Sequence, residues 1–367
     1  MPSARMMFPG GNTGLGFFSY YHYITPDDAR HKYIIKGGPG VGKSSLMKTL
    51  GERCLQAGLE VEYHWCSSDN NSLDGIALPQ YQVAVIDGTA PHVVDPRYPG
   101  AVDEIVNLGE QWDREVLVAS RQSIINNTRE IGLLFNRAYS QLTRAATMYN
   151  EIDLMMAAKV NESKLHSITR QLASLLDKEP SAMPFTNSFQ VRHIFASAIT
   201  PEGTVSYLSS LLSPGTQVYT LHGAAGSGGD VIMHSIGHQA ELAGYIVEYY
   251  HCPLFPQKIE TIYLPQHSLA LVNISRHIIE VLPSELASFK CQKIELNQHL
   301  APYVNYEEVA EVQERVHAAI GTAVALIKQA KQLHDELEVH YVAAMDFPAV
   351  DRVRDQLFDD LMSWCRD

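Results

Sequence analysis

Residues 36–45 read KGGPGVGKSS and contain the pattern G-x-x-x-x-G-K-[ST], in which glycines, a lysine and a hydroxyl residue stand at fixed positions. Such a loop lets backbone N–H groups converge on phosphate oxygens, while the lysine neutralises phosphate charge and the hydroxyl group binds Mg²⁺. We therefore predict a nucleotide site here, with Lys43 on the β- and γ-phosphates and Ser44 on the metal. Its predicted members are Gly37, Gly38, Pro39, Gly40, Val41, Gly42, Lys43, Ser44 and Ser45.

The segments around this loop predict the elements that it needs. Residues 33–36 (YIIK) are a short apolar run typical of a buried strand, and residues 44–57 have helical leucine spacing and end before Gly58, a good C-terminal cap. Residues 82–86 (QVAVI) form a second apolar run, which ends on Asp87. Strand, loop, helix and strand in this order indicate an α/β core with a mainly parallel sheet. Asp87 is the candidate second acidic partner of magnesium, beside Ser44.

Further polar residues follow the predicted strands and are expected at the same sheet edge. The segment CSSDNNSLDG follows the β-prone residues 59–66 and supplies Asp69 and Asp74, each a candidate general base or magnesium-shell ligand as well as a turn former. The segment after the second apolar run supplies His92, a candidate γ-phosphate contact. It also supplies Arg97, which would stabilise transition-state charge within its own subunit or across a subunit boundary.

The stretch HGAAGSGGDV at 222–231 repeats the first loop 186 residues later, with Gly223 on Gly37. This register holds without a gap as far as Asp87 on Asn273, and the entry segments and helical tails repeat at offsets of 187 and 185. Self-similarity over such a length predicts two whole domains. Prolines mark the joint near residues 179–188, so we expect copy one at 1–183 and copy two at 184–367.

Copy two lacks the residues that carry the chemistry of copy one. The equivalents of Lys43, Ser44 and Asp87 are Gly229, Asp230 and Asn273. Each change opposes a nucleotide–magnesium complex, and the carboxylate of Asp230 would repel phosphate at close range. We therefore expect copy two to be a degenerate P-loop domain that serves packing, partner binding or regulation.

Composition describes the rest of the molecule. The chain has 367 residues, of which 46% are hydrophobic, and a net charge of −13, which predicts two globular domains without attraction to nucleic acid or anionic membranes. Residues 101–178 and 304–347 contain no proline and are rich in helix formers, so each copy should carry an α-helical hairpin beside its sheet. The five cysteines show no CxxC spacing, and no apolar run is long enough to span a bilayer, which predicts a cytoplasmic protein.

Together these motifs resemble an uncharacterised bacterial family of tandem P-loop NTPase proteins, described as ATPases or as nucleotide-kinase-like proteins. The resemblance covers nearly the whole chain. It rests on FPGGNTGLGF at 8–17, KGGPGVGKSS, CSSDNNSLDG, DGTAPHVVDPRYPGAVDEIVNLG at 87–109 and FASAITPEG at 195–203. It implies a P-loop NTPase fold in each half and nucleotide and magnesium roles for Lys43, Ser44 and Asp87, and it supplies no substrate.

The sequence favours a Mg²⁺-dependent ATPase in which copy one hydrolyses ATP and copy two conveys the nucleotide state to a protein partner or to a second copy of the chain. ATP is preferred to GTP because the NKxD pattern is missing. A kinase, with Asp69 or Asp74 accepting the proton of an acceptor hydroxyl, stays open because no glutamate follows Asp87 directly. The well-separated arginines between residues 112 and 153 count against a kinase lid. A scaffold that holds nucleotide without turnover is the third alternative.

Overall fold

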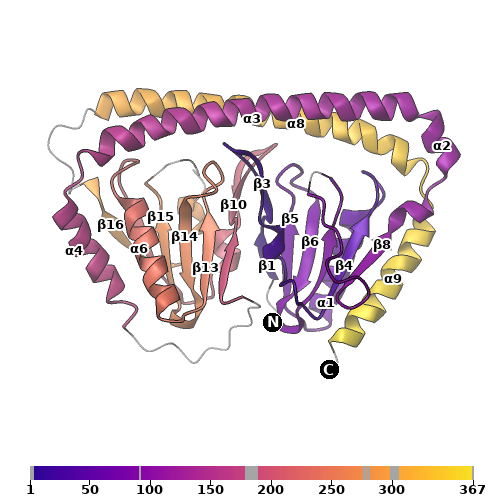
Figure 1. Cartoon of the computed structure of the whole chain (residues 1–367), viewed down its shortest axis with the longest axis horizontal. Coiled ribbons are helices and arrows are strands. Elements are labelled where there is room, and N and C mark those ends of the chain that lie inside the picture. The colour runs from indigo at the N-terminus through magenta and orange to yellow at the C-terminus, as the bar shows by residue number, and fades with distance from the viewer. Residues whose placement is uncertain are drawn as a thin grey trace.

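Each half of the chain forms a six-stranded sheet, and the two sheets stand side by side beneath a pair of long helices (Figure 1). The computed structural model describes residues 4–90, 92–177, 189–275, 278, 282–297 and 306–365. The predicted joint at 179–188, and with it the expected boundary between residues 183 and 184, lies outside the described residues.

The first sheet is mixed. Its order is β1 (Ala4–Met7), β5 (Val61–Trp65), β6 (Leu73–Leu78), β7 (Val83–Asp87), β4 (His31–Lys36) and β8 (Asp103–Asn107). Parallel pairing joins β1 to β5, β7 to β4 and β4 to β8, whereas β6 is antiparallel to both of its neighbours. The predicted strands at 33–36, 59–66 and 82–86 are confirmed as β4, β5 and β7. The antiparallel strand β6 was not predicted, because it directly follows a polar segment and the sequence does not mark where the strand begins.

The second sheet repeats the first strand by strand. Its order is β9 (Val191–Ile194), β13 (Val247–His251), β14 (Ile259–Leu264), β15 (Leu269–Asn273), β12 (Gln217–His222) and β16 (Lys290–Glu295). Again only the third strand, β14, runs antiparallel to both neighbours. Two similar mixed sheets in one chain confirm a tandem duplication of an α/β domain.

The two copies meet through their entry segments. Each contributes a small hairpin, β2 (Gly10–Thr13) with β3 (Gly16–Ser19) and β10 (Ser197–Thr200) with β11 (Gly203–Ser206). Between them Phe8 N donates to Phe195 O at 2.9 Å, and Phe195 N donates to Phe8 O at 3.2 Å. This reciprocal pair of bonds relates the copies by an approximate two-fold axis.

A helix follows each glycine-rich loop, as predicted. The helix α1 (Lys43–Gln56) begins after Gly42, whose φ of 93° favours glycine, and α6 (Gly229–Leu242) begins after Gly228 at φ 100°. Gly58, with φ 88°, follows the end of α1 and confirms the predicted C-terminal glycine. Both copies therefore keep the strand–loop–helix unit.

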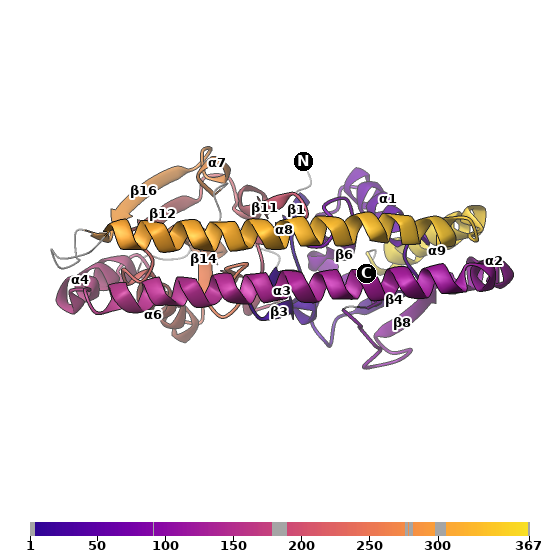
Figure 2. The same cartoon turned by 90° about the horizontal axis from the view of Figure 1, so that it is seen from above.

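The helical tails are two 37-residue helices, α3 (Arg121–Ala157) and α8 (Tyr306–Val342), each about 55 Å long. They run side by side in opposite directions across both sheets (Figures 1 and 2). Shorter helices complete the tails: α2 (Arg114–Ala119), α4 (Glu162–Ala173) and α9 (Phe347–Trp364), with α5 (Leu208–Leu211) and α7 (Leu282–Glu285) elsewhere in copy two. In the described residues no helix combines the length and apolar character needed to cross a membrane.

Each tail ends on the other copy, which differs from the expected hairpin beside its own sheet. Helix α9 of copy two buries Val350, Leu357 and Leu361 in the copy-one core next to α1. Helix α4 of copy one buries Leu165 and Leu172 in the copy-two core next to α6. The reason is geometric, since a 55 Å helix carries the chain past its own sheet before the next helix begins. The hairpin partner of α3 is therefore α8.

Candidate functional site

The copy-one loop (residues 37–44) connects β4 to α1 and buries the side chain of Val41 in the copy-one core. A Cβ atom at Gly37 would lie 2.8 Å from Val41 Cγ2, so a side chain there would force the loop open. Gly40 and Gly42 have φ values of 70° and 93°, in the left-handed region that favours glycine. The glycines of the pattern are therefore required by the path of this loop.

Lys43 lies over its own loop. Its Nζ donates to Gly37 O at 2.9 Å and to Gly38 O at 2.8 Å, and it lies 3.6 Å from Asp87 Oδ2. Asp87 is beside Lys43 because β7 is the direct neighbour of β4 in the sheet. The structure thus brings together the lysine and the acid that the sequence singled out.

The donor set at this point suits magnesium, which prefers oxygen ligands. Asp87 Oδ1 accepts hydrogen bonds from the backbone N and the hydroxyl of Thr89, which leaves Oδ2 directed at Lys43. Ser44 Oγ accepts a 3.0 Å bond from Leu73 N, so the hydroxyl is held at the start of β6. Ser44 and Asp87 are the residues that would hold the ion.

Asp69 lies in the turn between β5 and β6. Its Oδ1 accepts a 3.0 Å bond from Asn71 N, and its Oδ2 accepts a 2.7 Å bond from the hydroxyl of Ser72. Lys331, on α8 of copy two, lies 3.5 Å from the same Oδ2. Asp69 therefore shapes its turn and pairs with the other copy, contacts that differ from those expected of a free general base.

Asp74 and His92 lie together at the same sheet edge as Asp87. The carboxylate of Asp74, 4% exposed, lies 3.7 Å from His92 Nε2. Burial raises the pKa of the Asp74 carboxyl, even though His92 beside it acts in the opposite direction. Of the sequence candidates, Lys43 thus pairs with Asp87 and Asp74 with His92, while Ser44 bonds to Leu73, the residue before Asp74.

Arg97 lies at the opposite end of the strands. Its guanidinium group pairs with Asp27, and its side chain is 61% exposed. Its backbone N donates to Asp103, which begins β8 and pairs with Lys32 near the start of β4. Because β8 is parallel to β4, the chain after β7 must return along the sheet to begin it. We expected Arg97 at the sheet edge that carries the loop, because the strand β8 was not predicted. The structure places it at the opposite edge.

Two residues of copy two cover the copy-one loop and form a wall over it, which the sequence did not predict. A Cβ atom at Gly38 would lie 2.4 Å from the Tyr341 ring, and one at Gly40 would lie 2.9 Å from Glu338 O. Both residues belong to the carboxyl end of α8. The one sequence signal for this contact was the 185-residue repeat of the helical tails. It relates Tyr341 and Glu338 to Met156 and Asp153, which contact the copy-two loop.

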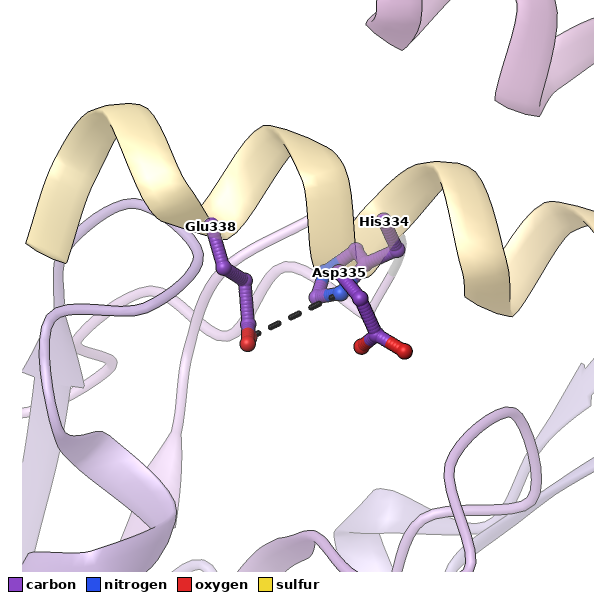
Figure 3. A group of neighbouring side chains, drawn as sticks. All are labelled: His334, Asp335 and Glu338. Atoms are coloured by element: carbon purple, nitrogen blue, oxygen red, sulfur yellow. Dashed lines mark ion pairs between the residues drawn. The ribbon is translucent and has the colours of Figure 1, made fainter.

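Acidic side chains line the same end of α8. His334, Asp335 and Glu338 bring one ligand atom each within 4.8 Å of one another, the one such group found in the described part of the chain (Figure 3). His334 Nδ1 lies 3.6 Å from Glu338 Oε1, and all three side chains are partly exposed. Asp335 also pairs with Lys331 of the same helix, which offsets part of the charge of the two carboxylates.

The copy-two loop (residues 223–230) is closed by internal ion pairs. Lys258 pairs with Asp153 of α3 and lies 3.4 Å from Asp230 Oδ2. Asn273 Nδ2 donates to Asp230 Oδ1 at 3.2 Å, and a Cβ at Gly229 would lie 2.8 Å from Asn273 Oδ1. The positions where copy one has its chemical residues are therefore occupied by mutually satisfied groups.

Comparison of the chain with protein-family models, curated proteins and solved structures found no match. The fold itself defines an α/β protein with two similar mixed six-stranded sheets, which indicates tandem duplicated α/β domains.

Proposed function

We propose that the copy-one loop binds a Mg²⁺–nucleoside triphosphate, ATP, and that the protein hydrolyses the terminal phosphate, as a P-loop ATPase of the kind its motifs resemble. The observation that carries the proposal is the contact between Lys43 and Asp87, 3.6 Å apart at the start of a 14-residue helix. A lysine, a carboxylate and a helix N-terminus at one sheet edge together suit a triphosphate with its metal.

Each residue has a defined role in this proposal. Lys43 gives up its hydrogen bonds to two loop carbonyls and donates to phosphate oxygens in their place. The lysine charge is already at the loop, so phosphate binding does not require another cation to be buried. Ser44 and Asp87 hold Mg²⁺, which supplies positive charge to the phosphate oxygens. The glycines keep the loop backbone close to the ligand.

Copy two is the regulatory half. Tyr341 and Glu338 of α8 pack on the glycines of the copy-one loop, and Lys331 of the same helix pairs with Asp69. Helix α8 packs along α3, which in turn contacts the copy-two loop through Asp153 and Met156. A ligand that reshapes the copy-one loop therefore acts on α8 and, through α3, on copy two.

The activity is tested by phosphate release from Mg-ATP, comparing the parent protein with Lys43→Ala and with the control Lys328→Ala, an exposed lysine of α8. We expect release that Lys328→Ala retains and that Lys43→Ala lowers by about 100-fold or more. ADP appearing only in the presence of a pool of nucleosides, nucleotides and sugars would make the protein a kinase. Lys43-dependent binding without release would make it a scaffold.

The regulatory role is tested with a tryptophan reporter. The rings of Trp112 and Tyr341 lie 6.0 Å apart, so Trp112 reports the position of the end of α8. In a variant with Trp65→Phe and Trp364→Phe, we expect the fluorescence of Trp112 to change when Mg-ATP binds, and the further change Lys43→Ala to abolish this response. Tight binding with constant fluorescence would mean that α8 is a static cover.

A further inference from the structure

A buried histidine follows Asp87 in the chain and contacts Asp74 and Tyr21. The side chain of His92 is 8% exposed, and neither ring nitrogen has a hydrogen-bond partner within the described ranges. Buried polar groups are nearly always hydrogen-bonded, so an unpaired one indicates a group kept for another purpose. The ring stacks on Tyr21, with 4.5 Å between centroids, and its Nε2 faces Asp74 at 3.7 Å.

The fold holds His92 in this place from two sides. Lys36 Nζ, at the end of β4, donates to Gly88 O at 2.8 Å and to Val94 O at 2.7 Å, which ties down both ends of the segment that contains His92. Asp74 lies on β6, which pairs with β5. Gly75 pairs with His64 and Leu73 with Trp65, so Asp74 between them is the extra residue of a β-bulge. Bulges commonly redirect a side chain beside an active site.

Copy two provides an internal comparison. The equivalents of Tyr21 and His92 are Leu208 at offset 187 and Ile278 at offset 186, and both are buried in an apolar cluster. The equivalent of Asp74 is Glu260, which accepts a 3.0 Å bond from the hydroxyl of Ser197. At these offsets the copy that has Lys43 carries polar rings beside the bulge, whereas the described residues of copy two are aliphatic; His277, next to Ile278, lies outside the described residues.

We infer that His92 is the proton acceptor for the attacking water and that Asp74 is its positioning residue, an inference that rests on the proposed ATPase function. The water oxygen forms a bond to the γ-phosphorus. The bond from this phosphorus to the bridging oxygen breaks, and its electron pair stays on the diphosphate. The water proton moves to the imidazole of His92, and the Asp74 carboxylate stabilises the resulting cation.

The first test separates binding from turnover. Affinity for Mg-ATP and phosphate release are measured for the parent protein, His92→Ala, Lys43→Ala and the control His166→Ala, an exposed histidine of α4. We expect His92→Ala to bind within a few-fold of the parent, to release phosphate about 100-fold more slowly and to recover part of its rate in added imidazole. His166→Ala should match the parent.

The outcomes distinguish this inference from the proposed function. Release that needs Lys43 but is unchanged in His92→Ala would overturn the role of His92 alone. Loss of nucleotide binding in His92→Ala, without rescue by imidazole, would show a structural role and also overturn it. Absence of Lys43-dependent release in the parent would overturn both proposals.

The role of Asp74 is tested by the split between binding and turnover. In the described residues, the side chains that contact the His92 ring are Asp74 from β6, Tyr21 from the turn at Tyr21–Tyr23 and Phe17 from β3. Without the Asp74 carboxylate the imidazolium that forms has no counter-charge, so Asp74→Asn should release phosphate more slowly while it binds Mg-ATP within a few-fold of the parent. Asp74→Glu should recover part of the rate. Equal loss of affinity and rate in Asp74→Asn, without recovery in Asp74→Glu, would overturn the positioning role.

Discussion

The guanidinium group of Arg192, on β9 of copy two, donates two hydrogen bonds of 2.8 Å to the carboxylate of Glu62, on β5 of copy one. The relation is reciprocal, since Arg5 of copy one bonds to Glu248 of copy two at 2.5 Å and to Glu62 at 2.8 Å. Although burial alone would raise it, the charge of Arg192 holds the pKa of Glu62 well below its usual range. Three buried charges and the partly buried Arg5 therefore join the two sheets.

Removing one partner of this network should be strongly destabilising. Arg192→Met leaves the Glu62 carboxylate buried with one cation in place of two, and we expect a loss of about 3–5 kcal/mol in the free energy of unfolding. Urea denaturation measures it. The control Lys293→Met removes an exposed ion pair with Glu295 and should cost at most about 1 kcal/mol. Equal losses in the two variants would contradict the importance of the buried network.

The interface should also lose stability in mild acid. His251 Nε2 lies 2.9 Å from His193 Nδ1, and burial, with the neighbouring His193, lowers the pKa of His251 from 6.5 to about 3. As pH falls below about 6.5, His251 becomes protonated in the unfolded chain, whereas in the folded chain it stays neutral down to about pH 3. Folding stability therefore decreases with falling pH.

The size of this effect follows from the pKa shift. Between pH 6.5 and 5 the loss should be about 2 kcal/mol, measured by urea denaturation at each pH. His251→Phe removes the titrating group and should flatten this part of the profile. A variant with the same pH dependence as the parent would show that other groups cause it.

The contact between Gly38 and Tyr341 should be measurable as a coupling between the copies. A Cβ at Gly38 would lie 2.4 Å from the Tyr341 ring, so Gly38→Ala should destabilise by about 1–3 kcal/mol. In the background of Tyr341→Ala the same substitution should cost much less, which a double-mutant cycle detects. Gly132→Ala on α3, where a Cβ meets no atom within 4 Å, is the matched control and should be neutral or stabilising. Additive costs would contradict the contact.

Restoring the pattern in copy two should not create a second nucleotide site. In Gly229→Lys with Asp230→Ser, the new side chain at 229 would meet Asn273, and Lys258 would keep its pair with Asp153. We expect one Mg-ATP per chain by calorimetry in both the parent and this variant, and none in Lys43→Ala. Two nucleotides per chain in the variant would mean that the copy-two loop has kept a usable shape.

Local sequence was enough to predict the loop, its flanking strand and helix, and the duplication, because these depend on residues close together in the chain or on a direct repeat. Lys43, Ser44 and Asp87 could be selected in this way, since β4, the loop and α1 are continuous and β7 ends on its acid. The features that depend on strand direction and helix length could not be predicted in this way. The reversed strand β6 brings Asp74 to His92, the return to β8 removes Arg97 from the loop, and the 37-residue helices carry each tail onto the other copy. These outcomes come from contacts between residues far apart in the chain, which local pattern does not encode.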